Sequence, residues 1–145
     1  MIIRPAGILV DDGRILTMRY QYSGRDRFNL PGGNHEDGEE LRVVLVREFA
    51  EELGVDVVVG DLIFMAETLV AQREVLHLLF AITSFDGEAK INSEETKAEE
   101  LVWLDKKSLL DAPLYPAIGV ELAKFIVGEQ PTKTHLGRIN QEWIA

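Results

Sequence analysis

The chain has 145 residues, 46% of them hydrophobic, and its 15 lysines and arginines against 25 aspartates and glutamates give a net charge of −10 at pH 7. The absence of cysteine excludes disulfides, thiolate metal sites and a thiol nucleophile. The acidic charge disfavours binding to nucleic acid or to an anionic membrane face, so an anionic ligand must be bound by local cations. With no apolar run of membrane length and no leader segment, we expect one cytoplasmic domain over residues 1–145, long enough to bury a core.

The N-terminal segment predicts paired strands. Two short strands are expected at residues 8–10 and 14–18, because they flank the hairpin signal Asp11-Asp12-Gly13. Residues 21–27 are polar and predict a loop, and residues 28–30 predict a short extended segment that a Pro-Gly-Gly turn ends.

A helix is expected over residues 39–53, which contain neither glycine nor proline. Its apolar residues recur at spacings of three and four, and Gly54 follows as a helix stop. The residues expected on the apolar face are Val43, Val46, Phe49, Ala50 and Leu53.

The remaining elements alternate in type. Strands are expected at residues 55–59, 62–70, 74–83 and 101–104, with a turn at Asp86-Gly87 and an acidic loop at 93–100. A second helix is expected at 119–127, with Pro116 suited to a first helical turn. This order favours an α+β domain, an α/β/α sandwich with a central mixed sheet.

The tail from residue 129 onward is polar until Trp143 and is expected to be partly ordered. The alternative is that Trp143 anchors the tail by docking.

The strongest chemical signal lies on the first helix. Glu48, Glu51 and Glu52 stand at i, i+3 and i+4, so their carboxylates share one face near the helix C-terminus, where the dipole disfavours anions. Such a patch is unfavourable unless a cation lies among the carboxylates, and an all-oxygen set suits Mg²⁺ or Mn²⁺. The alternative is a solvated acidic face in which Arg47 pairs with Glu51.

Residues 33–55 resemble the Nudix box of the Nudix (MutT-like) hydrolases. That pattern is Gly, five residues, Glu, seven residues, Arg-Glu, an apolar residue, any residue, Glu-Glu, any residue, Gly and an apolar residue. Every fixed position is matched, by Gly33, Glu39, Arg47, Glu48, Phe49, Glu51, Glu52, Gly54 and Val55. The order of the other elements also resembles this family to about Gly128.

The resemblance implies a Nudix fold and Mg²⁺- or Mn²⁺-dependent hydrolysis of a nucleoside diphosphate linked to a further group. It implies that Glu48, Glu51 and Glu52 bind the metal, with the Gly32 carbonyl as a further ligand. It also implies that Arg47 and Glu39 orient this cluster and that Gly33 lies beside the substrate. The general base stays open between Glu48 and an acid of the loop, for which the candidates are Glu94, Glu95, Glu99 and Glu100. Glu95 is the loop acid expected to be catalytic, beside Glu48, Glu52 and Arg47.

Cationic and aromatic residues outside the box are further candidates for substrate binding. Arg25 and Arg27 precede the glycine loop and are expected to contact substrate phosphate, the alternative being solvated loop charges. The histidines, His35, His77 and His135, are not at paired ligand spacing. Tyr20, Tyr22 and Phe28 can stack on a base, although burial is the simpler role for Phe28.

The substrate class is open at this level. A nucleoside triphosphate, a nucleotide sugar and a dinucleoside polyphosphate all fit, and the expected partner is a small nucleotide rather than a nucleic acid or a membrane. A homodimer is possible. The alternative to an enzyme is a silent Nudix-fold module that senses a nucleotide, but such modules usually lack box glutamates and this chain retains them all.

Overall fold

The computed structural model describes residues 1–141, so Trp143 lies outside the described part of the chain. The helices are α1 (Leu41–Leu53), α2 (Lys106–Asp111) and α3 (Gly119–Ile126). The strands are β1 (Ile2–Ile8), β2 (Val10–Asp11), β3 (Arg14–Tyr22), β4 (Arg25–Asn29), β5 (Asp56–Val70), β6 (Arg73–Asp86), β7 (Glu100–Leu104) and β8 (His135–Arg138). No helix within residues 1–141 is long and apolar enough to cross a membrane.

The strands form two sheets. The first has the order β1-β6-β5-β8 and is mixed, because β1 runs parallel to β6, β5 antiparallel to β6 and β8 parallel to β5. In the second sheet β3 pairs antiparallel with β2, β4 and β7. β1 therefore brings the N-terminal segment into the sheet that contains the two longest strands.

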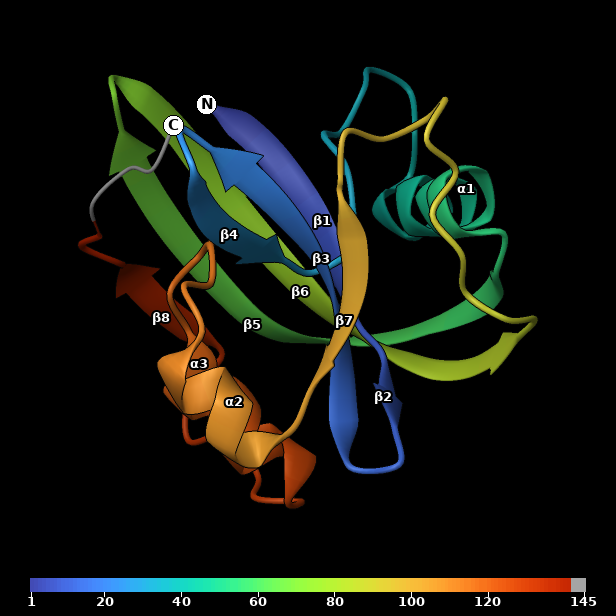
Figure 1. The fold of residues 1–145 in the computed structure, drawn as a ribbon. Coiled ribbons are helices and arrows are strands. Elements are labelled where there is room, and N and C mark those ends of the chain that lie inside the picture. Colours follow the sequence, from blue (N-terminus) through green and yellow to red (C-terminus); the bar gives the residue numbers. More distant parts are fainter. Residues whose placement is uncertain (142–145) are drawn as a thin grey trace.

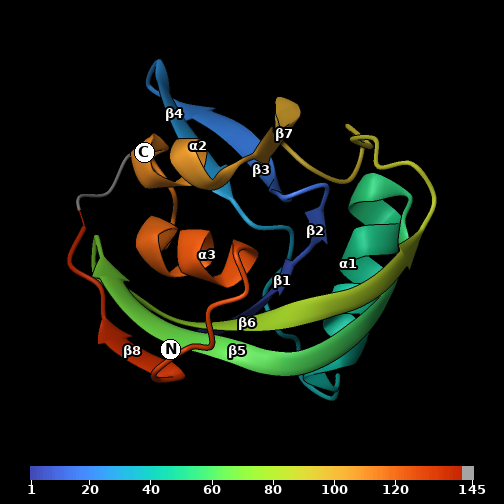
Figure 2. The ribbon, with the colours of Figure 1, turned by 90° about the horizontal axis from the view of Figure 1, so that it is seen from below.

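Helices lie on both sides of these strands. Helix α1 lies on one side, and α2 and α3 lie together on the opposite side, where α2 contacts α3 and β7 (Figures 1 and 2). The expected α+β class with a mixed sheet between helices is confirmed. The second, antiparallel sheet was not predicted as a separate unit.

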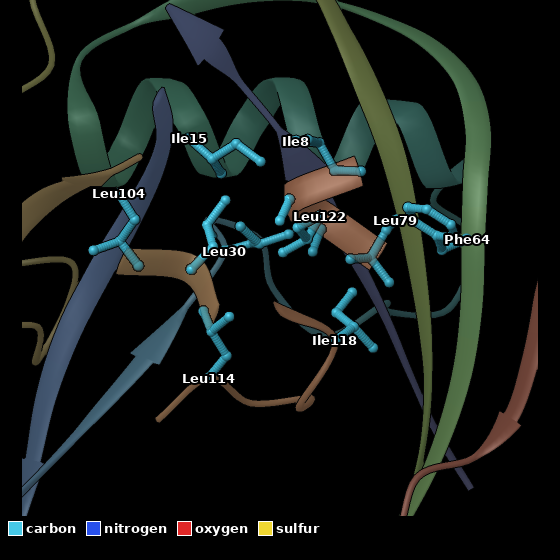
Figure 3. Close-up of a cluster of buried hydrophobic side chains, with 12 residues drawn as sticks. Ile8, Ile15, Leu30, Phe64, Leu79, Leu104, Leu114, Ile118 and Leu122 are labelled. Carbon is cyan, nitrogen blue, oxygen red and sulfur yellow. The ribbon is translucent and has the colours of Figure 1, made fainter. Parts of the chain in front are cut away.

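Each helical layer covers its own hydrophobic cluster. The cluster beneath α2 and α3 draws Ile8, Ile15, Leu30, Phe64 and Leu122 from both sheets, from the loop after β4 and from α3 (Figure 3). The cluster beneath α1 contains Leu45, Phe49 and Leu53 with side chains of β3, β5 and β6. Both faces of the layered strands are thus packed, which holds the segments that carry the candidate site.

Helix α1 confirms the predicted helix, but its buried face is different. Val44, Leu45, Phe49 and Leu53 are buried, whereas Val43 and Val46 are 52% and 42% exposed and Ala50 is exposed as well. Apolar residues surround this helix, so their spacing allows more than one face. Gly54 ends the helix as predicted, in a left-handed conformation with φ of 66°.

Several predicted boundaries were wrong. Residues 21–27 form a hairpin rather than a loop, because β3 continues to Tyr22 and β4 starts at Arg25. The strands expected at 55–59 and 62–70 are one strand, β5, whose pairing with β6 shifts register three times. Strands are predicted from alternating apolar and polar residues. That alternation is weak in the polar β3–β4 hairpin and is interrupted by the register shifts of β5.

The C-terminal third holds two elements that were not predicted. Helix α2 is only six residues long, and its N-cap Asp105 accepts a hydrogen bond from Ser108 N at 2.8 Å. Part of the expected tail forms β8, which pairs with β5 at Met65 and Glu67. Pro116 lies before the second helix rather than in it, since α3 starts at Gly119.

Candidate active site

Arg47 joins the acidic side chains of α1 and the loop before it. Its Nε and Nη2 donate to the two oxygens of Glu39, each at 3.0 Å, and its Nη1 donates to Glu48 and Glu51, each at 3.2 Å. The paired contact with the Arg47 guanidinium lowers the pKa of Glu39. Arg47 and Glu39, which the sequence predicts as orienting partners of the carboxylates, are thus in direct contact, and their orienting role stays a prediction.

Glu48 and Glu52 flank the buried face of α1, one turn apart. The Glu48 side chain is only 15% exposed, and burial raises the pKa of its carboxyl. Burial, together with the neighbouring Glu48 charge, raises the pKa of Glu52 to about 8. Ionisation of both half-buried carboxyls at once is therefore unfavourable. A bound cation would stabilise their ionised forms.

The loop after β4 places its backbone against these carboxyls. Gly33 lies so close to Glu48 that a Cβ atom at this position would overlap the Glu48 carboxylate. Gly32 lies against the backbone of β1, where its Cβ would overlap the Pro5 carbonyl oxygen, and Gly33 N donates to that oxygen at 3.3 Å. Only glycine fits both close approaches, so the Gly-Gly pair brings the main chain next to the glutamates.

The carboxylate and carbonyl oxygens of this site are the type of ligand that a hard divalent ion prefers. Within residues 1–141 no three acidic or histidine side chains are already gathered around one point, because Arg47 holds Glu48 and Glu51. Glu48, Glu51 and Glu52 would therefore bind Mg²⁺ or Mn²⁺ only after their side chains turn toward the ion. The carbonyl of Gly32 belongs to the same loop.

The acidic loop is tied to the end of α1. Asn92 N donates to the Glu52 carbonyl at 2.8 Å, and Asn92 Nδ2 donates to the Glu51 carbonyl at 3.2 Å. Glu95 lies exposed in the turn that follows Asn92, whereas Glu100 pairs with Arg19 at 3.3 Å. Glu94 and Glu95 thus both follow the residue that is bonded to the end of α1, whereas Glu100 is paired with Arg19.

A cavity of about 130 Å³ opens beside the glycine loop. Its polar lining includes three arginines and two asparagines, and its apolar lining comes from strands β1, β5 and β6. The lining residues are Ile2, Arg4, Arg27, Asn29, Asn34, Val70, Arg73, Val75 and Tyr115. Asn34 directly follows Gly33, so the cavity and the carboxylates adjoin the same loop.

Aromatic rings hold Arg27 in the cavity wall. The Arg27 side chain is buried, its guanidinium lies 4.3 Å from the centroid of the Tyr22 ring and 5.1 Å from that of Tyr115, and its Nη2 donates to the Tyr22 hydroxyl at 2.9 Å. Stacked guanidinium groups of this kind are stabilised by the ring electrons. Arg27 therefore presents a fixed positive charge in an acidic protein.

Behind Tyr115 lies a buried hydrogen-bonded chain. Thr68 Oγ1 lies 2.9 Å from the Tyr115 hydroxyl and 2.9 Å from His77 Nε2. Burial lowers the pKa of His77 to about 3, with the Arg4 charge acting in the same direction. His77 is therefore neutral at physiological pH and serves as a hydrogen-bonding group.

The structure brings together some predicted residues and leaves others apart. Arg27 lies in the cavity wall, but Arg25 is exposed at the β3–β4 turn and does not line the cavity. His35 Nε2 donates to the Glu39 carbonyl at 2.7 Å, and His135 lies 3.2 Å from Glu67. Phe28 packs against the hydrophobic cluster below α2 and α3, in keeping with its simpler role.

Sequence reasoning missed most of the cavity wall. Arg4 is a charged residue inside an apolar strand, and Asn29 is a polar residue at the end of one, so both carried a weak signal. Tyr115 and Arg73 lie far from the box in the sequence and carried none. Arg4 lines the cavity and donates to the Leu30 carbonyl at 3.3 Å, and its charge partly offsets the rise in the pKa of Glu52.

Comparisons with known proteins agree with this geometry. The model of the NUDIX domain family matches residues 1–125. A CTP pyrophosphohydrolase of Escherichia coli (strain K12) is 32% identical over 120 residues, which cover 81% of this chain and 85% of that protein. An uncharacterized Nudix hydrolase of Bacillus subtilis (strain 168) is 27% identical over 117 residues, covering 77% of this chain and 71% of that protein.

Solved structures show the same fold. The solution structure of the E. coli ORF135 protein superimposes with a TM-score of 0.76 at 28% identity, over 92% of this chain and 95% of that one. The crystal structure of a MutT NUDIX hydrolase from Burkholderia pseudomallei gives a TM-score of 0.71 at 25% identity, over 83% and 95%. With an intact Nudix box folded around its carboxylates, the chain belongs to the NUDIX family and is a pyrophosphohydrolase of that family.

Proposed function

We propose that this protein hydrolyses nucleoside 5′-triphosphates to the nucleoside monophosphate and pyrophosphate, with CTP as the first substrate to test. The observation that carries the proposal is the half-buried pair Glu48 and Glu52 beside Gly33, next to a cavity that contains three arginines. The name of the E. coli relative, CTP pyrophosphohydrolase, supports the choice of nucleotide. Water would add across a phosphoanhydride, and the P–O bond to the pyrophosphate leaving group would break.

The placement of the two regions supports a triphosphate that bridges them. The carboxylates of α1 repel phosphate groups unless a cation lies between them. Mg²⁺ or Mn²⁺ would bridge the two and neutralise charge on the phosphate oxygens. Arg4 and Arg27 offer donors to phosphate or sugar oxygens on the cavity side. A nucleotide whose phosphates lie over the glycine loop would place its nucleoside in the cavity.

Different side chains would bind the metal, orient the carboxylates and accept the proton. Glu48, Glu51 and Glu52 would hold the metal, with the Gly32 carbonyl, while Arg47 fixes the Glu39 and Glu48 carboxylates in place. Glu52 is one candidate to accept the proton of the attacking water, because its carboxyl lies beside Glu48 on the face of α1 that would hold the metal. Glu95 is the second candidate, being on the loop that Asn92 ties to Glu52.

A substrate panel tests the proposal. CTP, the other ribonucleoside triphosphates, a nucleotide sugar and a dinucleoside polyphosphate are incubated with Mg²⁺ or Mn²⁺, and the products are identified by chromatography. We expect CMP and pyrophosphate from CTP, with the highest kcat/KM for a triphosphate. Turnover of only a nucleotide sugar or a dinucleotide would replace the proposed substrate, and binding without turnover of any compound would refute the proposed activity.

A further inference from the structure

We infer that the segment after β8 clamps the loop between α2 and α3, and that Gln141 is a positioning residue that holds Tyr115 in the cavity wall. The inference rests on the proposed function for the ligand that this wall contacts. The NUDIX family model matches residues 1–125, whereas β8 and Gln141 follow that range. The clamp therefore involves residues outside the matched domain.

The first observation is a pair of hydrogen bonds made by one side-chain amide. Ala117 N donates to Gln141 Oε1 at 2.8 Å, and Gln141 Nε2 donates to the Leu114 carbonyl at 3.2 Å. A backbone donor and a backbone carbonyl fix the orientation of this amide. Because Leu114 and Ala117 lie on either side of Tyr115 in the sequence, the two bonds hold the backbone that carries the tyrosine.

The second observation is the anchor of the C-terminal segment on the first sheet. Strand β8 lies beside β5 (Figure 2). Met65 N donates to the Thr134 carbonyl and Ile139 N donates to the Glu67 carbonyl, each at 2.8 Å, so bonds to β5 lie just before and just after β8. Ile139 also packs against the hydrophobic cluster beneath α2 and α3. Gln141 follows two residues later, so it extends from a segment that is already ordered, and its two bonds need to order little further chain.

The third observation is what the clamped loop carries. Tyr115 lines the cavity, the Arg27 guanidinium lies 5.1 Å from the centroid of its ring, and its hydroxyl lies 2.9 Å from Thr68 Oγ1. Tyr115 N donates to the Phe28 carbonyl at 2.9 Å. The backbone of this loop is thus bonded to two separate segments, β4 and the chain after β8.

Loss of the clamp would affect binding rather than the chemical step. Gln141 does not line the cavity, and its two hydrogen bonds go to backbone atoms of the loop. Without them the Tyr115 ring would spend less time in the position that a ligand contacts, and the apparent affinity falls in proportion to that fraction. The carboxylates of α1 would be unchanged, so KM should rise while kcat stays the same.

A double-mutant cycle in the full chain tests the clamp. Gln141→Met keeps the length of the side chain and loses both hydrogen bonds, and Tyr115→Ala removes the ring that the clamp positions. Gln130→Met, the same substitution at an exposed glutamine outside the cavity, is the matched control. Steady-state kinetics with CTP and Mg²⁺ give kcat and KM for the parent, the three single variants and the double variant.

We expect Gln141→Met to raise KM about 5- to 20-fold with kcat within about twofold of the parent, and Gln130→Met to change neither by more than about twofold. In the Tyr115→Ala background, Gln141→Met should raise KM by less than about twofold, because the ring is absent. An unchanged KM in Gln141→Met, or an equal rise with and without the Tyr115 ring, would overturn the inference. If Tyr115→Ala does not fold, Tyr115→Leu takes its place.

Hydrogen exchange at the Tyr115 amide, measured without a ligand, separates the clamp from the proposed function. That amide donates to Phe28 rather than to Gln141, so faster exchange in Gln141→Met, but not in Gln130→Met, reports release of the whole loop. Faster exchange in a protein that hydrolyses no triphosphate would support the clamp and refute the proposed function. Hydrolysis of CTP with unchanged exchange at Tyr115 would support the function and refute the clamp.

Discussion

The acidic face of α1 and the wall of the neighbouring cavity differ in how complete they are without a ligand. Glu48 and Glu52 are half-buried like charges with raised pKa values, which Arg47 beside Glu48 and the Arg4 charge near Glu52 offset only in part. In the cavity wall, by contrast, Arg27 and Tyr115 are stacked and hydrogen-bonded into the fold. The proposed reaction centre therefore carries negative charge that a cation would offset, whereas the cavity wall is arranged in advance and, among residues 1–141, includes the buried Asn29 Oδ1 without a hydrogen-bond partner.

This difference predicts that substitutions on α1 change turnover and those in the wall change binding. The largest effect is expected for Glu52→Gln, and a similar one for Glu48→Gln, with kcat lowered by at least ~10²-fold, the scale for losing a metal-positioning or base residue. Steady-state kinetics with Mg²⁺ measure it. Glu88→Gln, at an exposed position outside the site, is the control and should leave kcat unchanged.

The same variants should not weaken the metal-free fold. The pKa of Glu52 is raised to about 8 from 4.5, so between these values the unfolded chain ionises while the folded protein resists, and stability falls as pH rises. Glu52→Gln removes this loss. Its melting temperature without metal at pH 8 should equal or exceed that of the parent, and a large decrease would mean that Glu52 is structural.

Two adjacent glycines separate function from stability. Gly33→Ala places a methyl group against the flexible Glu48 side chain, so we expect kcat to fall about tenfold while the melting temperature changes little. Gly32→Ala places it against the Pro5 backbone, so the protein should lose about 2 kcal/mol or more of unfolding free energy. Thermal melts and kinetics on both variants check this contrast, and the reverse pattern would contradict it.

Arginines of the β3–β4 hairpin give a smaller and more selective effect. Arg27→Ala should weaken binding of a non-hydrolysable CTP analogue by about 1–3 kcal/mol, because it removes a charged donor from the cavity. Arg25→Ala, at an exposed position two residues away, should change affinity by almost nothing. Calorimetry in the presence of Mg²⁺ compares them, and equal losses would show that both charges act only at long range.

The smallest effect at neutral pH is expected for His77. Its pKa of about 3 lies below the unfolded value of 6.5, so the unfolded state binds more protons between these values. Stability should therefore fall as pH decreases below 6.5, by up to about 1.4 kcal/mol per pH unit. Urea unfolding from pH 7 to 4 measures the slope, which His77→Gln should reduce; an unchanged slope would assign it to other groups.

The two regions also differ in what their sequences predicted. The α1 site lies within residues 33–55, so helical spacing and the box motif placed Arg47 beside Glu39, Glu48 and Glu51, and Gly54 at the helix end. The buried face was not predictable, because Val43 and Val46 are apolar yet exposed. Local spacing therefore determined the reaction centre better than the packing beneath it.

The cavity wall depends on contacts between distant segments. Tyr115 reaches Arg27 because the chain after α2 pairs with Phe28, and His77 reaches Thr68 across paired strands. The spacing of residues along the sequence does not predict these contacts. The hairpin at 21–27 was also missed, because its alternation of tyrosines and charged residues lacks the apolar face of an ordinary strand.

The central claim is that the α1 carboxylates bind the phosphates through a metal, and titration of a non-hydrolysable CTP analogue by calorimetry tests it most directly. In a protein of net charge −10, affinity should fall at least about tenfold when Mg²⁺ is removed, since the carboxylates then face the phosphates without a cation between them. Equal affinity with and without Mg²⁺ would contradict the account.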